Sequence, residues 1–536
     1  MERFSILPIL GRKTDVAQND FSLFRVMSER VVATHDVGGH DYNISSKPNT
    51  CRKADGYSQY DNTANAQATK ILGLFELYDG TNRIQIVADN GKLFYLDGSL
   101  DQTALADAAA TTFANDNIDL YTFIKIGSYM VFTDRGEHTP YKWKSGDANL
   151  TKLAASGTEY KFKWIESFQR RVIGVYCPDD TDAPDLSVRW STPWPSTAIT
   201  SLNFPLANQA YISNDDPISG VKTMGLDRCF VYSKNSIHAI DYYADYATPF
   251  RIRNVISGQG SVNNHSIVDT GMGHYLFNEH YGFCGFDGNE FPAGGRPISS
   301  DIETDLGEID NAYHELIQGV FVPWRNEIIW TVPFRSSATP SMLFIYNINT
   351  GQWRFEEKAF RYLDLWKTGS ALTWNGLIAL LGGTGATWEM AGNNSWAYYS
   401  AFKSRLAMGN TDGHVYLQQG TSADGSDFEG YRIEPILDFG DPFARKILQE
   451  IWFEFAIASN FSVDVYYRSG DTVGEITGAA WTQLDSISSN SPTEPVTYVP
   501  DTSAKRLYQI KWGSDSMSEP FEVNRIDFVY TMEAKY

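Results

Sequence analysis

Two pairs of histidine and aspartate combine residue types that metal sites use. His35 and Asp36 precede a Gly-Gly turn, and His40 and Asp41 follow it. A zinc site needs three or four such ligands, and no third ligand pattern accompanies the two pairs. We therefore expect residues 35–41 to form a solvated loop.

A second segment, residues 177–185, concentrates carboxylates. Four aspartates stand within seven residues: Asp179, Asp180, Asp182 and Asp185. Oxygen ligands at this density suit Ca²⁺, yet the glycine and the terminal glutamate of an EF-hand loop are missing. We expect an acidic loop here, with Ca²⁺ binding between Asp179 and Asp185 as the alternative.

The cysteines do not indicate a metal site or a disulfide framework. All four are far apart in the sequence, and none belongs to a C-x-x-C pair: Cys51, Cys177, Cys229 and Cys284. At least two fall in expected strands, where a thiol behaves as a small buried apolar side chain. The sequence therefore predicts free thiols.

Motifs of the common enzyme classes are missing. The sequence contains no G-x-S-x-G elbow, no P-loop, no G-x-G-x-x-G after a strand and no H-E-x-x-H. Carboxylates are so frequent that no glycosidase pair stands out. The Ser-x-Asp-x-Gly-x-x-x-Trp turns of sialidase propellers are matched only in part, at residues 422–427. We therefore predict no catalytic residue, no cofactor and no metal ligand.

Charge and hydropathy limit the partners. The 536 residues carry a net charge of −21, which opposes specific binding to DNA or to anionic membranes. Residues 1–53 depart from this balance, because eight basic and six acidic side chains give them +2. The apolar run at residues 6–10 is too short for a signal peptide, and no stretch reaches the ~20 apolar residues of a membrane helix. We expect synthesis in a reducing cytoplasm.

A repeated unit organises the central part of the chain. It consists of an apolar strand, a polar turn and an aromatic-rich strand, as in CFVYS-KNS-IHAIDYY from Cys229 and HYLFN-EHYG-FCGFDG from His274. The unit recurs roughly every 43–57 residues, the length of a four-stranded propeller blade. Its starts are Ile84, Tyr129, Val172, Cys229, His274, Ile328 and Leu377.

The predicted fold class is all-β. It comprises a β-propeller of about seven blades, with six to eight compatible with the spacing, and a C-terminal antiparallel β-sandwich. Ring closure removes the free strand edges that an open array would keep. The strand that closes the ring is left open, as is whether residues 405–418 complete the last blade or begin another.

Three segments depart from the blade unit. Residues 99–118 are an Ala-rich insert, expected as a loop or short helix at a rim. Residues 299–310 predict a short helix, because Ser300 and Glu303 match a capping box and Ile302, Leu306 and Ile309 share one face. Its other face carries acids, either solvated or facing a partner: Asp301, Glu303, Asp305, Glu308 and Asp310. From about residue 431 the strands become longer and alternate apolar with polar residues.

These patterns divide the chain into three parts. Residues 1–60 are expected to form an N-terminal arm and the first strands of a platform, residues 61–425 the propeller, and residues 430–536 the sandwich or platform domain.

Three motifs of the central part resemble one family. They are DDPISGVKTMGLDRCFVYSKNSIHAI from Asp215, GQGSVNNHSIVDTGMGHYLF from Gly258 and YNINTGQW from Tyr346. Over about residues 53–380 the chain resembles the β-propeller proteins of short-tailed phages known as tail nozzle or packaged-DNA stabilisation proteins. The resemblance implies a virion structural protein without enzyme activity, which forms a ring below the portal and adaptor, extends or closes the DNA channel, and gates genome retention and ejection.

The same resemblance implies the partners and the location. We expect a homo-hexamer in the virion tail, assembled in the host cytoplasm, that contacts the head-tail adaptor or portal ring and tail fibre, spike or needle proteins. Genomic DNA would pass without sequence-specific binding, and an acidic channel suits this because it does not hold the phosphates. Two alternatives remain: a glycan-binding or glycan-cleaving propeller with a lectin-like sandwich, and a kelch-like cellular scaffold.

Overall fold

The structure is a computed structural model, and nearly all of its regular elements are strands. It describes residues 2–6, 44–47, 50–62, 70–80, 82–107, 112–113, 120–154, 157, 159–194, 199, 202–212, 215–243, 249–290, 297–335, 337–368, 403–434, 436–455, 462–488, 496–499, 503–516 and 521–533. Residues 35–41, the metal candidate of the N-terminal part, lie outside this description. No helix within the described ranges is long and apolar enough to cross a membrane.

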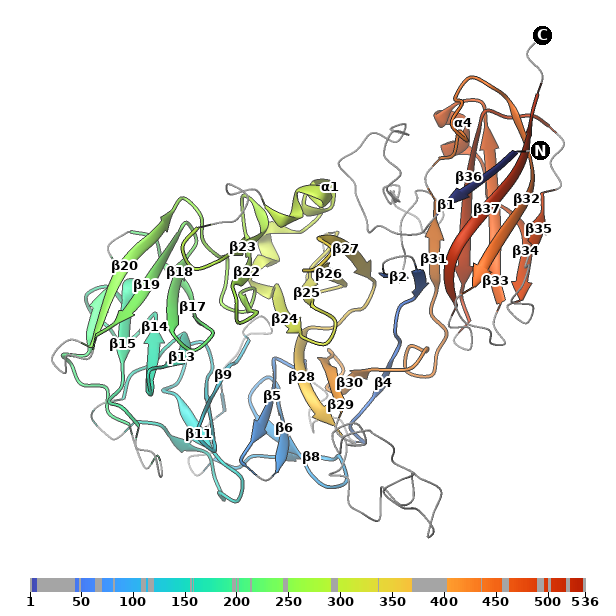
Figure 1. Cartoon of the computed structure of the whole chain (residues 1–536). Coiled ribbons are helices and arrows are strands. Elements are labelled where there is room, and N and C mark those ends of the chain that lie inside the picture. The colour runs from blue at the N-terminus through green and yellow to red at the C-terminus, as the bar shows by residue number, and fades with distance from the viewer. Residues whose placement is uncertain are drawn as a thin grey trace, which may run out of the picture.

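Seven antiparallel sheets follow one another along the chain as blades (Figure 1). Blades one and two are β5 (Gly73–Tyr78), β6 (Arg83–Ala88), β7 (Leu93–Leu96) and β8 (Gln102–Ala104), then β9 (Thr122–Ile126), β10 (Tyr129–Thr133), β11 (Tyr141–Trp143) and β12 (Thr151–Lys152). Blades three and four are β13 (Trp164–Phe168), β14 (Arg171–Val175), β15 (Ser187–Trp190) and β16 (Gln209–Tyr211), then β17 (Ile218–Met224), β18 (Arg228–Ser233), β19 (Ser236–Tyr242) and β20 (Phe250–Ser257).

The last three blades continue this order. In the described residues, blade five has three strands: β21 (Val268–Asp269), β22 (His274–Asn278) and β23 (Gly282–Phe286). Blade six consists of β24 (Gln318–Val322), β25 (Glu327–Val332), β26 (Met342–Asn347) and β27 (Gln352–Glu356). Blade seven consists of β28 (Tyr362–Thr368), β29 (Lys403–Gly409), β30 (Val415–Gln418) and β4 (Tyr57–Gln59).

The blades form a closed ring, so the chain is a seven-bladed β-propeller. The first strand of each blade contacts the first strand of the next, and β28 of blade seven contacts β5 of blade one. The first six sequence starts, Ile84 to Ile328, fall in the second strands of blades one to six, as the repeat predicts. Leu377 lies outside the described residues. Residues 405–418 belong to β29 and β30, and thus to blade seven.

Ring closure uses a strand from the N-terminal part of the chain. β4 is antiparallel to β30, with Ser58 opposite Leu417. The closing blade therefore combines three strands from residues 362–418 with one from residues 57–59. β4 lies within the segment 1–60 that the sequence assigned to the arm and platform.

The segment after blade five differs from the predicted capped helix. It contains two 3₁₀ helices, η3 (Ile298–Ile302) and η4 (Asn311–Leu316), and one helical turn, α1 (Glu303–Leu306). The N-cap of α1 is Ile302, without a side-chain capping bond, so the capping box at Ser300 is wrong. Nearby Gly282 has φ of +72°, and a Cβ there would lie 2.5 Å from Leu306 Cδ1, which explains how the segment packs closely on β22 and β23.

The two faces of this segment are only partly as expected. Ile302 and Ile309 are buried in the blade-six core, and Leu306 packs against it, which confirms the shared apolar face. The acids do not form one solvated patch. Asp305 is buried, and Glu308 pairs with Arg335 at 2.8 Å.

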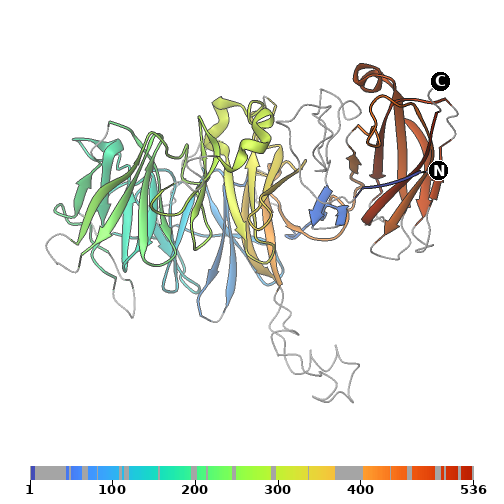
Figure 2. The ribbon, with the colours of Figure 1, turned by 45° about the horizontal axis from the view of Figure 1, so that its top comes forward.

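Strands from both ends of the chain form the second body, a pair of sheets beside the propeller (Figure 2). One sheet contains β1 (Glu2–Ile6), β2 (Ile44–Lys47), β3 (Thr50–Lys53), β37 (Glu522–Met532), β32 (Lys446–Phe455) and β35 (Val496–Tyr498). The other contains β31 (Gly430–Ile433), β36 (Leu507–Ser514), β33 (Ser462–Gly470) and β34 (Thr482–Ser488). A common core that includes Ile451, Trp512 and Phe528 fills the space between the sheets, as expected for a β-sandwich.

Candidate functional site

The carboxylates of residues 179–185 are used by the protein itself. Asp180 is buried and accepts hydrogen bonds from Arg189 Nη2 at 3.0 Å, from Gln209 Nε2 at 2.8 Å and from the Tyr211 hydroxyl at 3.1 Å. Asp179 accepts one from the Lys161 backbone at 2.9 Å. No group of three metal-ligating side chains occurs among the residues that the structure describes. The geometry of the described residues therefore fits the expected acidic loop better than the Ca²⁺ alternative.

Replacing Asp180 by asparagine is expected to lower the free energy of unfolding by about 3 kcal/mol, because it leaves the Arg189 guanidinium buried without its carboxylate. Chemical denaturation measures the loss. Ca²⁺ and EDTA should leave the thermal midpoint of the unsubstituted chain unchanged. A midpoint that rises with Ca²⁺ and no longer does so in Asp180→Asn would instead establish a calcium site.

The four cysteines are buried and form no disulfide. Burial raises the pKa of the Cys177 thiol to about 11 and that of Cys284 to about 12. Both thiols stay protonated at neutral pH and are weak nucleophiles.

Two carboxylates lie close together where blades seven and one meet. Burial, and then the charge of Glu76, raise the pKa of Asp364 to about 7. Asp364 accepts a hydrogen bond from Trp366 Nε1 at 3.0 Å. Glu76 pairs with Arg83 at 2.5 Å and accepts a hydrogen bond from the Lys367 backbone. The ring makes this pair by joining β28 to β5, so no local motif could predict it.

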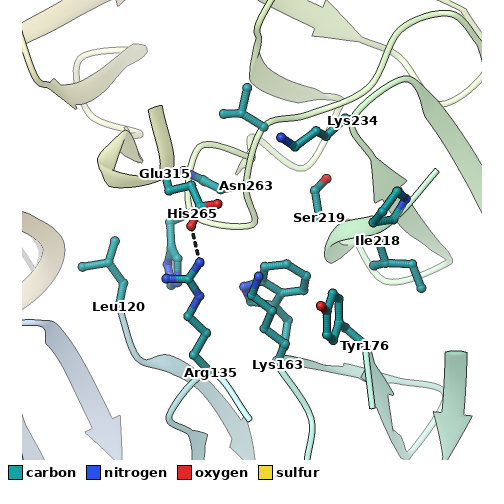
Figure 3. A pocket seen from close by; sticks show the side chains of 13 residues that line it. Leu120, Arg135, Lys163, Tyr176, Ile218, Ser219, Lys234, Asn263, His265 and Glu315 are labelled. Carbon is teal, nitrogen blue, oxygen red and sulfur yellow. Dashed lines mark hydrogen bonds and ion pairs between the residues drawn. The ribbon is translucent and has the colours of Figure 1, made fainter. Parts of the chain in front are cut away.

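One cavity among the described residues lies at one end of the ring, and Figure 3 shows the side chains that line it. Its volume is about 190 Å³, and its walls come from blades two to five and from η4. The lining residues are Leu120, Arg135, Lys163, Trp164, Tyr176, Pro217, Ile218, Ser219, Lys234, Val262, Asn263, His265 and Glu315. Most of them lie at the start of the first strand of a blade or just after the end of its second strand. Because these two strands are antiparallel, both points lie at the same end of the blade.

The cavity is cationic although the chain is acidic. Arg135, Lys163 and Lys234 point toward one space in Figure 3. Glu315 is the only carboxylate of the lining, and it pairs with Arg135. With His265 neutral, three positive charges against one negative leave +2.

Lys163 is the most perturbed of these cations. Burial, and then the positive charge of Arg135, lower the pKa of Lys163 to about 8. Its ammonium lies 4.6 Å from the centre of the Trp164 ring and 4.9 Å from that of Tyr176. The ammonium of Lys163 therefore makes cation–π contacts with two aromatic rings. No carboxylate of the described residues lies within 4 Å of it.

Two polar atoms of the lining lack hydrogen-bond partners among the described residues. They are Ser219 Oγ and His265 Nε2. Ser219 is 4% exposed, so its side chain is buried in the wall of the cavity. Burial, and then the charges of Lys222 and Arg135, lower the pKa of His265 to about 3. The imidazole is therefore neutral at physiological pH.

Sequence reasoning predicted none of these cavity residues as part of a site, although seven of them fall in the motifs at residues 215–240 and 258–277. They come from segments about one blade apart and meet only in the closed ring. A signal exists in the repeat, since Arg135 and Lys234 occupy the turn after the second strand of blades two and four. Aligning the units on these turns would have placed both cations at one end of the ring.

No protein-family model matches the chain, and no curated protein matches it. Solved structures with similarity include an exo-β-1,3-galactanase from Phanerochaete chrysosporium, at 10% identity and a TM-score of 0.28, covering 80% of this chain and 99% of that one. An extracellular domain of a hybrid two-component system from B. thetaiotaomicron matches at 7% identity and a TM-score of 0.43, covering 88% and 58%. A gluconolactonase from Xanthomonas campestris matches at 15% and 0.29, covering 53% and 97%. TM-scores below 0.5 give no argument about function.

Proposed function

We propose that this protein is a structural component of a phage tail, which forms a ring below the portal and adaptor and extends or closes the DNA channel. One observation carries the proposal: a seven-bladed propeller is joined to a sandwich that both ends of the chain build together. The three motifs that resemble nozzle proteins, residues 215–240, 258–277 and 346–353, lie in blades four to six and in the connection between blades four and five. The strands outside the blades form the body available for contacts between copies.

The two bodies differ in what they offer to a partner. The propeller has no free inner edge. Four of its outermost strands, β8, β12, β16 and β4, are two or three residues long, whereas β27 has five residues and β20 has eight. The sandwich has longer strands, up to 11 residues in β37, and at one edge of a sheet the seven-residue β34, in which Gln483, Asp485 and Ser486 are exposed. Edge strands pair readily with other chains. We therefore assign ring formation to the sandwich.

Charge also suits a channel for DNA. A net charge of −21 on each copy repels the phosphates of a duplex, which carries one charge per roughly 1.7 Å. A genome could then slide past the ring without being held. This protein would act without catalysis.

The expected result is a ring of about six copies, formed alone or on a portal and adaptor complex encoded in the same genome. Native mass spectrometry of the full chain, with and without that complex, measures the mass. A chain that ends at residue 481 lacks β34, β35, β36 and β37, and with them most of the sandwich, and should no longer bind the complex. A monomer that ignores the complex would contradict the proposal.

A glycan-directed propeller is the second candidate, and the pair Asp364 and Glu76 favours it. A carboxyl group with a raised pKa, such as Asp364, beside a second carboxylate is the arrangement by which glycosidases divide acid and base roles. Neither residue lines the described cavity, however, and Glu76 is held by Arg83. Release of reducing sugar from a panel of polysaccharides, lost in Glu76→Gln, would establish this candidate. No release from any of them would leave the structural role.

A further inference from the structure

We propose that the cavity between blades two and five is a binding site for a small dianionic oxyanion, phosphate or a phosphomonoester. The tail role does not require this site, so the two proposals stand or fall separately. The site is built by Arg135, Lys163, Lys234, Ser219 and His265.

Charge balance gives the ligand its sign and valence. The three cations and Glu315 leave the cavity at +2, and neither lysine has a carboxylate within 4 Å among the described residues. Burying charge without a counter-charge is costly, and Lys163 already shows this in its lowered pKa. A ligand with two negative charges neutralises the cavity. A ligand with one negative charge would leave one positive charge of the cavity buried without a counter-charge.

The unpartnered polar atoms indicate what else the ligand provides. Ser219 Oγ can donate a hydrogen bond to an anionic oxygen. His265 Nε2 has no hydrogen-bond partner among the described residues either. In the neutral imidazole this nitrogen donates or accepts according to the tautomer, so it suits an anionic oxygen or a hydroxyl group of the ligand. Monohydrogen phosphate and sugar phosphates offer both anionic oxygens and a hydroxyl donor.

Size and surroundings agree with this class. A cavity of about 150 Å³ already holds a benzene molecule, so about 190 Å³ accommodates phosphate together with a small organic group. Trp164 and Tyr176 offer apolar surface for such a group beside the ammonium of Lys163. Asn263 contributes little, because its amide already donates to the carbonyls of His314 and Ile317 at 3.1 Å.

Isothermal titration calorimetry of the full chain tests the proposal, with inorganic phosphate at neutral pH and chloride at equal ionic strength as the reference. Lys163→Met and Lys234→Met should each weaken phosphate binding about tenfold or more, since each removes a charge-assisted hydrogen bond. Ser219→Ala should weaken it by a smaller factor. Lys92→Met, at an exposed lysine in the β6–β7 turn, is the matched control and should leave it unchanged.

Three further measurements distinguish among anionic ligands: the binding of a phosphomonoester, the binding of a phosphodiester and the pH dependence of the affinity. Glucose 6-phosphate should bind at least as well as phosphate, whereas a phosphodiester dinucleotide, with one charge per phosphate, should bind more weakly. Affinity should fall as the pH rises above about 8, because Lys163, which faces Arg135, Lys234 and Glu315, loses its proton. Equal binding of dinucleotide and phosphate would overturn the dianion assignment.

The proposal is overturned if phosphate produces no more heat than chloride. It is also overturned if the Lys163 and Lys234 variants bind phosphate as the unsubstituted chain does. Lys234 is exposed at the rim of the cavity, so its substitution tests the site even where the Lys163 variant folds poorly.

Discussion

A chain that lacks residues 1–62 is expected to leave its propeller open and to lose most of its stability. β4 is the fourth strand of blade seven, and it is the part of this blade that comes from the other end of the sequence. Its flanks connect two blades. Tyr60 donates a backbone hydrogen bond to Val415 at 2.8 Å, and Asn62 donates one to Leu100 of blade one at 3.0 Å.

Side chains add to this closure. The Tyr57 ring lies edge-on to Phe360 at 4.9 Å and to Tyr416 at 5.6 Å. Asp61 is buried and accepts hydrogen bonds from His414 Nδ1 at 3.1 Å and from Gln102 of blade one. Without the strand, β30 becomes an open edge with its core residues uncovered. Burying each such side chain stabilises by roughly 1.5–3 kcal/mol, against about 5–15 kcal/mol for a whole domain.

The matched control is a chain that lacks only residues 1–43. It loses β1 but keeps β2, β3 and β4, so its propeller should stay closed. Hydrogen exchange measured by mass spectrometry should show loss of protection in β28, β29 and β30 of the longer truncation and not of the shorter one. Because the longer truncation also removes the three sandwich strands β1, β2 and β3, two more than the control loses, Ser58→Pro in the full chain provides a third variant. Proline cannot donate a hydrogen bond to β30, and the same blade should lose protection. Equal protection in all these chains would contradict the closure.

The repeat could be predicted because each blade contains its own signal. An apolar second strand, a turn of polar residues and an aromatic third strand follow one another within about 15 residues, as at Cys229 and His274. Such local patterns determine strand and turn directly. Six of the seven starts consequently fall in the second strands, and residues 405–418 show the same unit for blade seven.

The closing strand could not be predicted, because its signal is not local. β4 has three residues, and its partner β30 lies more than 350 positions further along the chain. No pattern in residues 57–59 distinguishes a blade strand from an arm. The capping box failed for a related reason. Ser299 Oγ hydrogen-bonds the Phe283 backbone at 2.9 Å, so contacts with blade five determine how the segment begins and the local motif does not.

The cavity could not be predicted either, because its residues are far apart in the sequence and no local pattern distinguishes them. Arg135 and Lys163 are separated by 27 residues of blade-forming sequence, and His265 by a further hundred or so. Each is unremarkable in its own segment. Their proximity follows from the order of blades around the ring, which the repeat length implies but does not resolve to single side chains.

A buried group of charges joins blade six to the connection between β3 and β4. Arg354 pairs with Glu327 at 2.7 Å and also with Glu356, and Lys358 lies 2.7 Å from Glu356. These side chains are at most 9% exposed. Lys358 also donates to the Asp55 backbone carbonyl at 2.6 Å, which fixes the chain shortly before the closing strand.

Replacing Glu356 by glutamine is expected to lower the free energy of unfolding by about 3 kcal/mol at neutral pH. The substitution keeps the shape of the side chain but leaves Lys358 buried without its carboxylate, and breaking a buried pair in this way costs roughly 3–5 kcal/mol. Urea denaturation of both chains measures the difference. The matched control is Glu357→Gln at the neighbouring, exposed position, where a loss below about 1 kcal/mol is expected.

The pH dependence of the same variant gives an independent check. Burial alone would raise the pKa of Glu356, but the charges of Lys358 and Arg354 outweigh it and lower the pKa to about 2. The ionised carboxylate therefore stabilises the fold fully above the ordinary glutamate pKa of 4.5, and this contribution is lost as the pH falls toward 2. The difference between the unsubstituted chain and Glu356→Gln should thus shrink from neutral pH to about pH 3. A difference that stays constant would mean that shape or hydrogen bonding, and not the charge of Glu356, holds this part of the ring together.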